Sequence, residues 1–266
     1  MNKYIYPKLP ALYTTPFFRI SGNGLANCLF VYAKAIILAE KYNAKIISPT
    51  WFNITLGPYL RCQSDKRHYL GLFNHDSEVF GLQKMLLLLF KHTCSNEEDL
   101  NNNGGIFEIS GIYDFFEPLL GYSINVKNYL LKHLKRGLLD SLNNFDFRYC
   151  IAVHIRLGDF PESRRIPMQW YVSMINKYGK GKKILIFSDG RDQELTEILE
   201  LPNTQRAHFG GAIQDIFAIS NCQFLIGSDS SFSAWGAYLG QVPCCFYRLQ
   251  FGNLLDDASK QTIENE

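Results

Sequence analysis

The second half of the chain alternates short apolar runs with amphipathic stretches. Residues 149–157 are too apolar to have a solvated face, which predicts a central strand of a parallel sheet. The pattern that follows predicts helices at 169–178, 192–200, 212–220 and 232–239, and strands at 183–187, 223–227 and 242–247. Strands that alternate with helices indicate a doubly wound parallel sheet, so we expect an α/β fold.

The first half has one clear unit. Phe17–Ile20 predicts a strand, the glycine turn after it leads into a stretch with apolar residues at helical spacing, and Ala44–Ser48 predicts the next strand. This is the pattern of a βαβ unit whose helix ends near Tyr42 and Asn43. Further along, the pattern predicts an apolar helix at 80–92 and a polar loop at 95–105, without fixing the strand order.

These patterns allow one large or two modest Rossmann-like units, and the shift in pattern favours a boundary near residue 148. The first would span residues 1–148, the second 149–252, and a tail would follow at 253–266. A chain of 266 residues is long enough for two modest units, each with its own core.

Composition narrows the function classes. The net charge is only +2, so nothing global attracts nucleic acid and any anion site must be local. Seven cysteines without a C-x-x-C pair read as reduced core residues rather than as a zinc framework. The first twenty residues lack the apolar core of a signal peptide, and the run Met85–Phe90 is too short to span a bilayer. We therefore expect a cytoplasmic protein without a transmembrane segment, either free or peripheral at the inner membrane face.

Polar side chains stand where the first apolar strand of the second half ends. His154, Arg156, Gly158 and Asp159 spell H-x-R-x-G-D. The fork of an arginine can make two parallel charge-assisted hydrogen bonds, which suits a diphosphate. The alternative is a structural ion pair between Arg156 and Asp159. His154 shares a strand face with Arg156, and either a catalytic role or a hydrogen-bonded core position fits it.

Two further strand ends are also polar. Ser188 and Asp189 close the second strand, where the carboxylate could accept from a ribose or a guanine edge, or one of the two could cap the next helix. Residues 228–233 close a third strand and open a helix, which predicts a phosphate cradle, with simple capping by Ser230 as the alternative. The candidate nucleotide-binding residues are Gly24, Asn27, His154, Arg156, Ser188, Asp189, Asp229, Ser230, Ser231 and Phe232.

Four segments together resemble one enzyme family. The sequence "GNGLANCLFVYAKAIILAEKYNA" is similar to the G-L-G-N-Q-L-F signature of the α-1,2-fucosyltransferases, and "AVHIRLGDF" to their H-x-R-x-G-D motif. "ILIFSDG" is similar to their F-S-D segment and "FLIGSDSSFSAWGAYLG" to their S-S-F-S-W-W segment. The α-1,6 and protein O-fucosyltransferases are wider relatives. The chain departs from the pattern at Cys28, expected to face the cleft, at Gly190 and at Ala234.

The resemblance implies a glycosyltransferase B fold, in which two Rossmann-like halves face a cleft. It also implies an inverting, metal-independent transfer of fucose or a related sugar from a GDP-sugar to a glycan hydroxyl. The first half would serve the acceptor, a glycan or a lipid-linked oligosaccharide, and no cofactor is expected. Arg156, Asp159 and His154 would be catalytic, with Arg156 neutralising the β-phosphate and Ser230 and Ser231 binding the diphosphate. The general base would be Asp159 or Asp189, with Glu162 third. The alternative function is a non-catalytic nucleotide-sugar or glycan-binding module.

Overall fold

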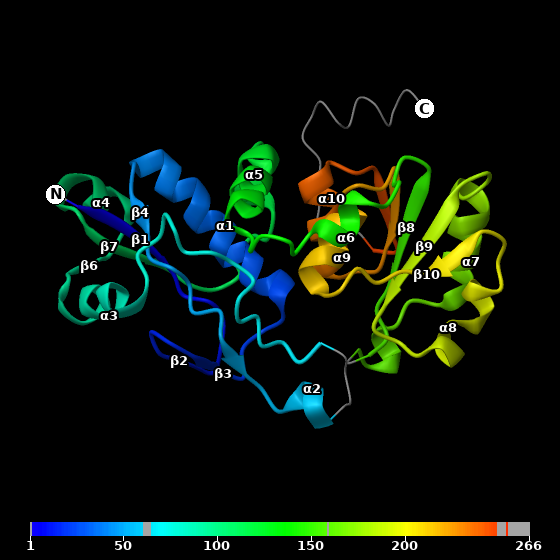
Figure 1. Cartoon of the computed structure of the whole chain (residues 1–266), viewed down its shortest axis with the longest axis horizontal. Coiled ribbons are helices and arrows are strands. Elements are labelled where there is room, and N and C mark those ends of the chain that lie inside the picture. Colours follow the sequence, from blue (N-terminus) through cyan, green and yellow to red (C-terminus); the bar gives the residue numbers. More distant parts are fainter. Residues whose placement is uncertain (1, 61–64, 159, 249–253, 255–266) are drawn as a thin grey trace. The chain divides into compact units, whose positions relative to one another are not determined.

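The computed structural model describes residues 2–60, 65–158, 160–248 and 254 (Figure 1). The chain forms two compact units, Met1–Arg136 and Gly137–Glu266, called units 1 and 2 here. The expected tail, apart from Leu254, lies outside the described residues, as does Asp159.

Unit 1 is built on a parallel sheet with the strand order β4-β1-β7-β6. Its strands are β1 (Lys3–Pro7), β4 (Lys45–Ile46), β6 (Thr93–Cys94) and β7 (Gly105–Ile109). A smaller sheet holds β2 (Tyr13–Thr14), β3 (Arg19–Ile20) and β5 (Asn53–Ile54). The helices are α1 (Leu25–Tyr42), α2 (Gly57–Leu60), α3 (Gly81–Phe90), α4 (Glu97–Asn103), a 3-10 turn at Glu117–Leu119, and α5 (Ser123–His133).

The βαβ unit of the first half is β1–α1–β4, so the predicted strand at Phe17–Ile20 was wrong as its first member. Tyr4, Ile5 and Tyr6 are buried in β1, although the charge and prolines around them hid the strand. Only Arg19–Ile20 is extended in the predicted segment, and it pairs in the smaller sheet. The end of α1 is as predicted, because Asn43 closes it at φ 47°, a conformation that asparagine tolerates.

The predicted loop at 95–105 was also wrong, because α4 occupies most of it. The side chain of Asn96 caps this helix by accepting from the N–H of Asp99 at 2.8 Å. Three acidic residues follow in its first turn, where the helix dipole favours them. The polar composition that indicated a loop is therefore a capping pattern.

Unit 2 contains the predicted doubly wound sheet, with all neighbours parallel in the order β10-β9-β8-β11-β12. Its strands are β8 (Cys150–Ile155), β9 (Lys183–Ser188), β10 (Thr204–Arg206), β11 (Phe224–Gly227) and β12 (Cys244–Phe246). Its helices are α6 (Asp140–Asn143), a 3-10 turn at Glu162–Arg164, α7 (Met168–Tyr178), α8 (Asp192–Leu199), α9 (Ala212–Ile219) and α10 (Ser231–Gly240). The edge strand β10 is half exposed and polar, so its pattern was missed.

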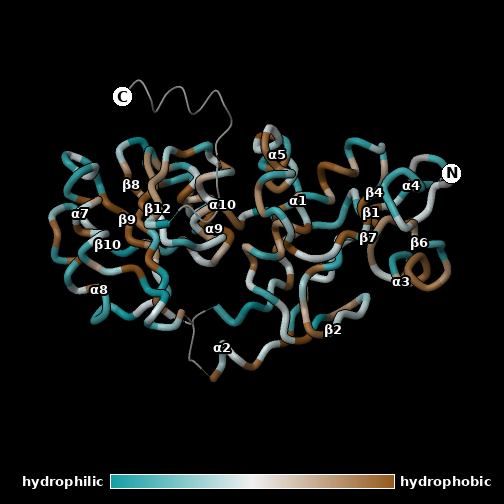
Figure 2. The backbone as a smooth tube through the Cα atoms, turned by 180° about the vertical axis from the view of Figure 1, so that it is seen from behind, coloured by the Kyte–Doolittle hydropathy of each residue, from teal (hydrophilic) through white to brown (hydrophobic). Residues whose placement is uncertain are grey.

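The central strand β8 is buried along its whole length, and Figure 2 shows the hydrophobic stretches of unit 2 gathered in its strands and helices. From β8 the chain runs outward through β9 to β10, then returns to the other side of β8 at β11. The order therefore reverses between β8 and β11. In open parallel sheets, ligands bind beyond the carboxyl ends of the strands at such a switch point.

Candidate functional site

The predicted polar residues of unit 2 meet where the strand order reverses. Gly227 of β11 lies beside His154 of β8 in the sheet register, and the N–H of Ser228 donates to the carbonyl of His154 at 3.0 Å. On the other side of β8, Ser188 lies beside Ile155. The strands β8, β9 and β11 therefore end at one sheet edge, where the chain segments that follow them begin.

Arg156 is braced by Asp189. Its Nη1 lies 2.9 Å from Oδ2 of Asp189, and both side chains are about one-quarter exposed. The other oxygen of Asp189 accepts from the N–H groups of Leu157 at 2.8 Å and Gly158 at 3.0 Å. The carboxylate thus fixes both the guanidinium and the backbone turn after β8. The sequence suggested Asp159 as the partner of Arg156 in an ion pair; Asp159 lies outside the described residues, and the pair that the structure contains is with Asp189.

Two glycines make room for this arrangement. A Cβ added to Gly158 would lie 2.7 Å from Oδ2 of Asp189, which is closer than real Cβ contacts. A Cβ at Gly190 would lie 2.5 Å from Cδ1 of the buried Leu157. The departure from the family pattern at Gly190 therefore has a steric basis, since this turn has no space for a second aspartate.

His154 is held in the interior by the β11–α10 segment. Its Nδ1 lies 2.8 Å from Oγ of Ser228 and 2.5 Å from Oγ of Ser233, and its ring stacks on Phe232 with 4.8 Å between centroids. The pKa of His154 is lowered to about 3, mainly by burial; Asp189 opposes this shift and the neighbouring Arg156 contributes to it. The ring is therefore neutral near pH 7 and links the central strand to the start of α10.

The burial of His154 predicts a specific acid lability. A histidine with a pKa of about 6.5 in the unfolded chain and about 3 in the folded protein stabilises the fold fully above pH 6.5, and this contribution is lost as the pH falls toward 3. Between pH 6 and 4, the free energy of unfolding should fall by about 1 kcal/mol per pH unit more in the wild type than in His154→Asn. Urea unfolding across this range measures the difference, and parallel curves would contradict it.

The serine-rich start of α10 has mixed roles. Ser230 is the N-cap, and its Oγ accepts from the N–H of Phe232 at 3.2 Å, so the capping alternative holds for this residue. Ser231 is half buried in the first turn. Asp229 is buried and accepts from the N–H of Arg248 at 2.9 Å, and burial raises its pKa. The segment thus offers a helix N-terminus, which favours an anion.

Further arginines lie at the same edge of the sheet, and sequence reasoning missed them. Arg165 donates to the carbonyl of Leu157 at 2.8 Å, and Arg206 donates to the carbonyls of Ser188 at 3.0 Å and Gly190 at 2.7 Å. The hydroxyl of Ser188 in turn accepts from the N–H of Gly190 at 3.0 Å. The sequence could have indicated Arg165 as a further candidate, because this residue follows closely after the H-x-R-x-G-D segment.

The glycine turn of unit 1 stands at the start of α1. Gly24 is the N-cap, and the N–H of Leu25 donates to the hydroxyl of Tyr69 at 2.8 Å, while Asn27 lies in the first turn. Cys28 is fully buried, so the expectation that it faces a cleft was wrong. Its sulfur lies 3.5 Å from Nη1 of the buried Arg19, and burial raises the pKa of the thiol.

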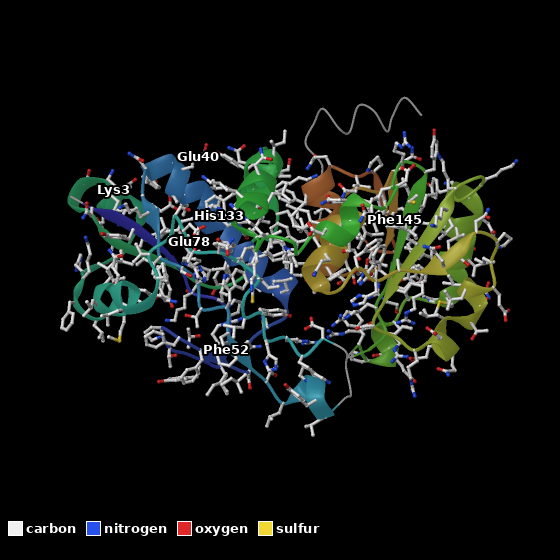
Figure 3. All side chains as sticks on the ribbon, viewed as in Figure 1. Lys3, Glu40, Phe52, Glu78, His133 and Phe145 are labelled. Carbon is white, nitrogen blue, oxygen red and sulfur yellow. The ribbon has the colours of Figure 1, made fainter. Side chains whose placement is uncertain are left out.

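Unit 1 also contains a buried polar cluster around Glu78, which the sequence pattern did not indicate (Figure 3). The hydroxyls of Tyr32 and Tyr129 donate to Oε1 of Glu78 at 2.6 and 3.2 Å, and Nδ1 of His75 lies 3.1 Å from Oε2. Burial raises the pKa of Tyr32 well above its usual range. Through Tyr32 and Tyr129, which both donate to Glu78, the cluster links α1 and α5.

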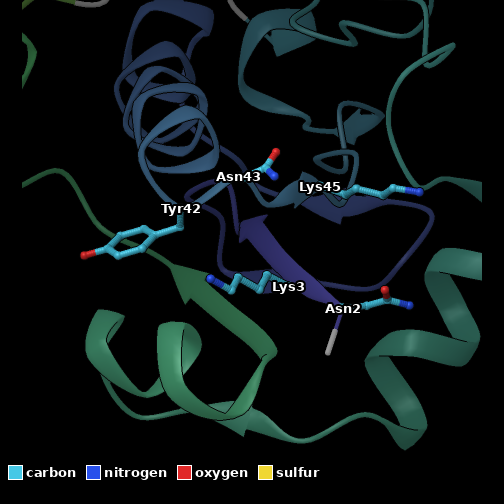
Figure 4. Close-up of a pocket in the computed structure, with 5 residues that line it drawn as sticks. All are labelled: Asn2, Lys3, Tyr42, Asn43 and Lys45. Atoms are coloured by element: carbon cyan, nitrogen blue, oxygen red, sulfur yellow. The ribbon is translucent and has the colours of Figure 1, made fainter.

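A cavity of about 220 Å³ opens elsewhere on unit 1, beside β1 and β4 (Figure 4). Its lining residues are Asn2, Lys3, Tyr42, Asn43 and Lys45. None of them was a candidate from the sequence. Within the described part of the chain, no three His, Cys, Asp or Glu side chains group closely enough to hold a metal ion.

No protein-family model and no curated protein sequence matches the chain. Solved structures do match. The fucosyltransferase NodZ from Bradyrhizobium superposes with a TM-score of 0.56 at 12% identity, over 90% of this chain and 93% of that one. NodZ α-1,6-fucosyltransferase co-crystallised with GDP superposes with a TM-score of 0.58 at 12% identity, over 93% of this chain and 96% of that one. A mutant of Arabidopsis thaliana FUT1 in complex with GDP superposes with a TM-score of 0.51 at 15% identity, over 97% of this chain and 73% of that one.

At these identities the likeness establishes the fold. The predicted fold class is confirmed, because the chain is an α/β protein with parallel sheets of the glycosyltransferase B type.

Proposed function

We propose that the chain is a glycosyltransferase that moves fucose or a related sugar from a GDP-sugar to a glycan hydroxyl. The observation that carries the proposal is the braced guanidinium of Arg156 at the point of unit 2 where the strand order reverses, together with the helix start at Ser231. A fixed cation and a helix N-terminus at one sheet edge suit a diphosphate. NodZ, a protein of the same fold, is described as co-crystallised with GDP, which supports this class of ligand.

The chemistry follows from the leaving group. The acceptor hydroxyl forms a bond to the anomeric carbon of the donor sugar, the bond from that carbon to the β-phosphate oxygen breaks, and its electron pair leaves with GDP. Arg156 stabilises the charge that grows on this phosphate without having to reorganise, since Asp189 already holds it in place.

The proton of the acceptor hydroxyl goes to a base. Both oxygens of Asp189 have partners within unit 2, which disfavours it for this role. Glu162 is exposed in the 3-10 turn after β8, and Asp159 lies outside the described residues. Its place in the H-x-R-x-G-D motif makes Asp159 our preferred candidate. A strongly dissociative transition state would need little help from any base.

The finer assignments rest on the sequence motifs. They resemble those of α-1,2-fucosyltransferases, so we propose an α-1,2 linkage, although NodZ is described as an α-1,6 enzyme. The proposed acceptor is a glycan or a lipid-linked oligosaccharide. Peripheral attachment to the inner face of a membrane, where a lipid-linked acceptor is presented, completes the proposal.

Incubating the protein with GDP-fucose tests this function, even with water as the acceptor. We expect release of GDP and free fucose, with turnover unchanged by EDTA. With glycan acceptors, methylation analysis of the product should show fucose on a 2-hydroxyl. If GDP binds and no donor is consumed with any acceptor, the non-catalytic binding module is the correct alternative. A 6-linked product would overturn only the linkage.

A further inference from the structure

Exposed apolar side chains are distributed unevenly over the molecule. Thirteen of the twenty-two large ones that are exposed in the described part of the chain come from three segments of unit 1, whereas unit 2 contributes two tyrosines. The thirteen are Leu12, Tyr13, Phe17, Ile20, Ile54, Leu56, Tyr59, Leu60, Phe80, Leu82, Leu86, Leu89 and Phe90. We call them the apolar edge. Several protrude almost fully, with Leu12 and Leu60 each 83% exposed and Phe90 80% exposed.

The three segments of the apolar edge are joined to one another. The strand β3 pairs with both β2 and β5, which places Ile20 opposite Ile54. The helix α3 is tied to the β2–β3 hairpin through Thr50. Lys84 donates to Oγ1 of Thr50 at 2.8 Å, and that hydroxyl donates to the carbonyl of Thr15 at 3.0 Å. In both Figure 1 and Figure 2, α3, the hairpin and α2 lie along the lower edge of unit 1.

The charges of these segments are one-sided. Residues 10–20, 53–60 and 80–92 contain no aspartate or glutamate. Of their cations, Arg19 and Lys84 are buried, and burial lowers the pKa of Lys84 to about 7. Lys91 follows Phe90 directly, and its Nζ donates to the carbonyl of Asn2 at 3.1 Å. Lys66 lies 5.0 Å above the ring of Tyr59 and follows the exposed Asp65 in the sequence. The thirteen side chains of the apolar edge are uncharged, and half-exposed lysines lie at two of its margins.

We propose that the apolar edge docks unit 1 onto an anionic lipid surface. Leucine and phenylalanine side chains that are exposed to this degree suit the interface of a bilayer, which accepts apolar protrusions of any shape. The lysines at the margins match the negative surface of anionic lipids. No helix of the described part is long and apolar enough to cross a membrane. This inference rests on the proposed function and names the surface through which the proposed peripheral attachment would occur.

Vesicle sedimentation of the full chain tests the proposal. The wild type is expected to bind vesicles of phosphatidylcholine with 30% phosphatidylglycerol, and to bind pure phosphatidylcholine at least fivefold more weakly, because each cation near the surface contributes about 1 kcal/mol. The triple variant Leu86→Gln, Leu89→Gln, Phe90→Gln should lower the partition coefficient at least tenfold. A second variant, Leu12→Gln with Leu60→Gln, covers the other segments. All five positions are exposed, so both variants should fold.

The matched control is Ile124→Gln, because Ile124 is 69% exposed on α5, at the upper side of unit 1 in Figure 1. It should bind vesicles like the wild type. Equal partition of the wild type and both edge variants would overturn the proposal. So would a wild-type dimer in analytical ultracentrifugation that the triple variant abolishes, because the edge would then bind a second copy. GDP binding measured in the same variants distinguishes failure of the membrane proposal from failure of the proposed transferase function. We expect it to remain unchanged whether or not the variants bind vesicles.

Discussion

Replacing Arg156 with alanine should lower sugar transfer from GDP-fucose at least a hundredfold. A preorganised donor aimed at the charge that develops in a transition state is worth on the order of 3 kcal/mol, which corresponds to about two powers of ten in rate. The loss should appear mainly in kcat, because the charge on the β-phosphate grows as the bond breaks. Steady-state kinetics with GDP-fucose measures it.

The matched control is Arg156→Lys, which keeps a positive charge beside Asp189 but removes the fork. It should fall between the wild type and the alanine variant. Both variants should keep the fold, because Asp189 retains the two backbone N–H donors of Leu157 and Gly158. Wild-type kcat in Arg156→Ala, with an unchanged melting curve, would refute the role assigned to this residue.

Replacing Asp189 with alanine should damage both stability and transfer. The change leaves the guanidinium of Arg156 without this carboxylate and removes the acceptor of two backbone donors. Hydrogen bonds to a charged group are worth about 2 kcal/mol each in favourable cases, and partial exposure of the pair lowers this, so we expect a loss of about 2 kcal/mol in the free energy of unfolding. Misplacing the guanidinium by about 1 Å should reduce transfer on the order of a hundredfold.

Asp189→Asn separates the two effects. The amide oxygen can still accept from Leu157 and Gly158, so the stability of the fold should largely return. Transfer should stay low, because the amide does not hold the guanidinium as a carboxylate does. Chemical unfolding and turnover measured on both variants provide the comparison. If Asp189→Ala unfolds like the wild type and transfers sugar at the normal rate, the ion pair between Asp189 and Arg156 has no functional role.

The fold of unit 2 could be predicted because its strands are buried on both faces. The apolar run at β8 and the helices after it have strong periodicity, so pattern and structure agree there, apart from the polar edge strand β10. Unit 1 was harder. The pattern located β4, but it missed β1 and β7, which have five residues each, and β6, which has two. In β1 the charge and prolines around the buried residues hid the strand, and a two-residue strand such as β6 leaves no alternation to detect.

The candidate site was predictable as a set of strand ends, since parallel strands bring their carboxyl ends to one edge. The partners within the set were not predictable. Arg156 and Asp189 are far apart in sequence, and the pattern offered Asp159 as a nearer partner. Ser228 and Ser233 contact His154 because of the way the β11–α10 segment packs on β8, which the pattern of apolar and polar positions does not indicate.

Calorimetric titration of GDP and GMP tests the central claim most directly, because the two ligands differ only in the β-phosphate that Arg156 is proposed to hold. The wild type should bind GDP at least tenfold more tightly than GMP, and Arg156→Ala should lose most of this preference while binding GMP as before. Equal affinity of the wild type for GDP and GMP, or a full GDP preference in the alanine variant, would contradict a diphosphate site built around this guanidinium.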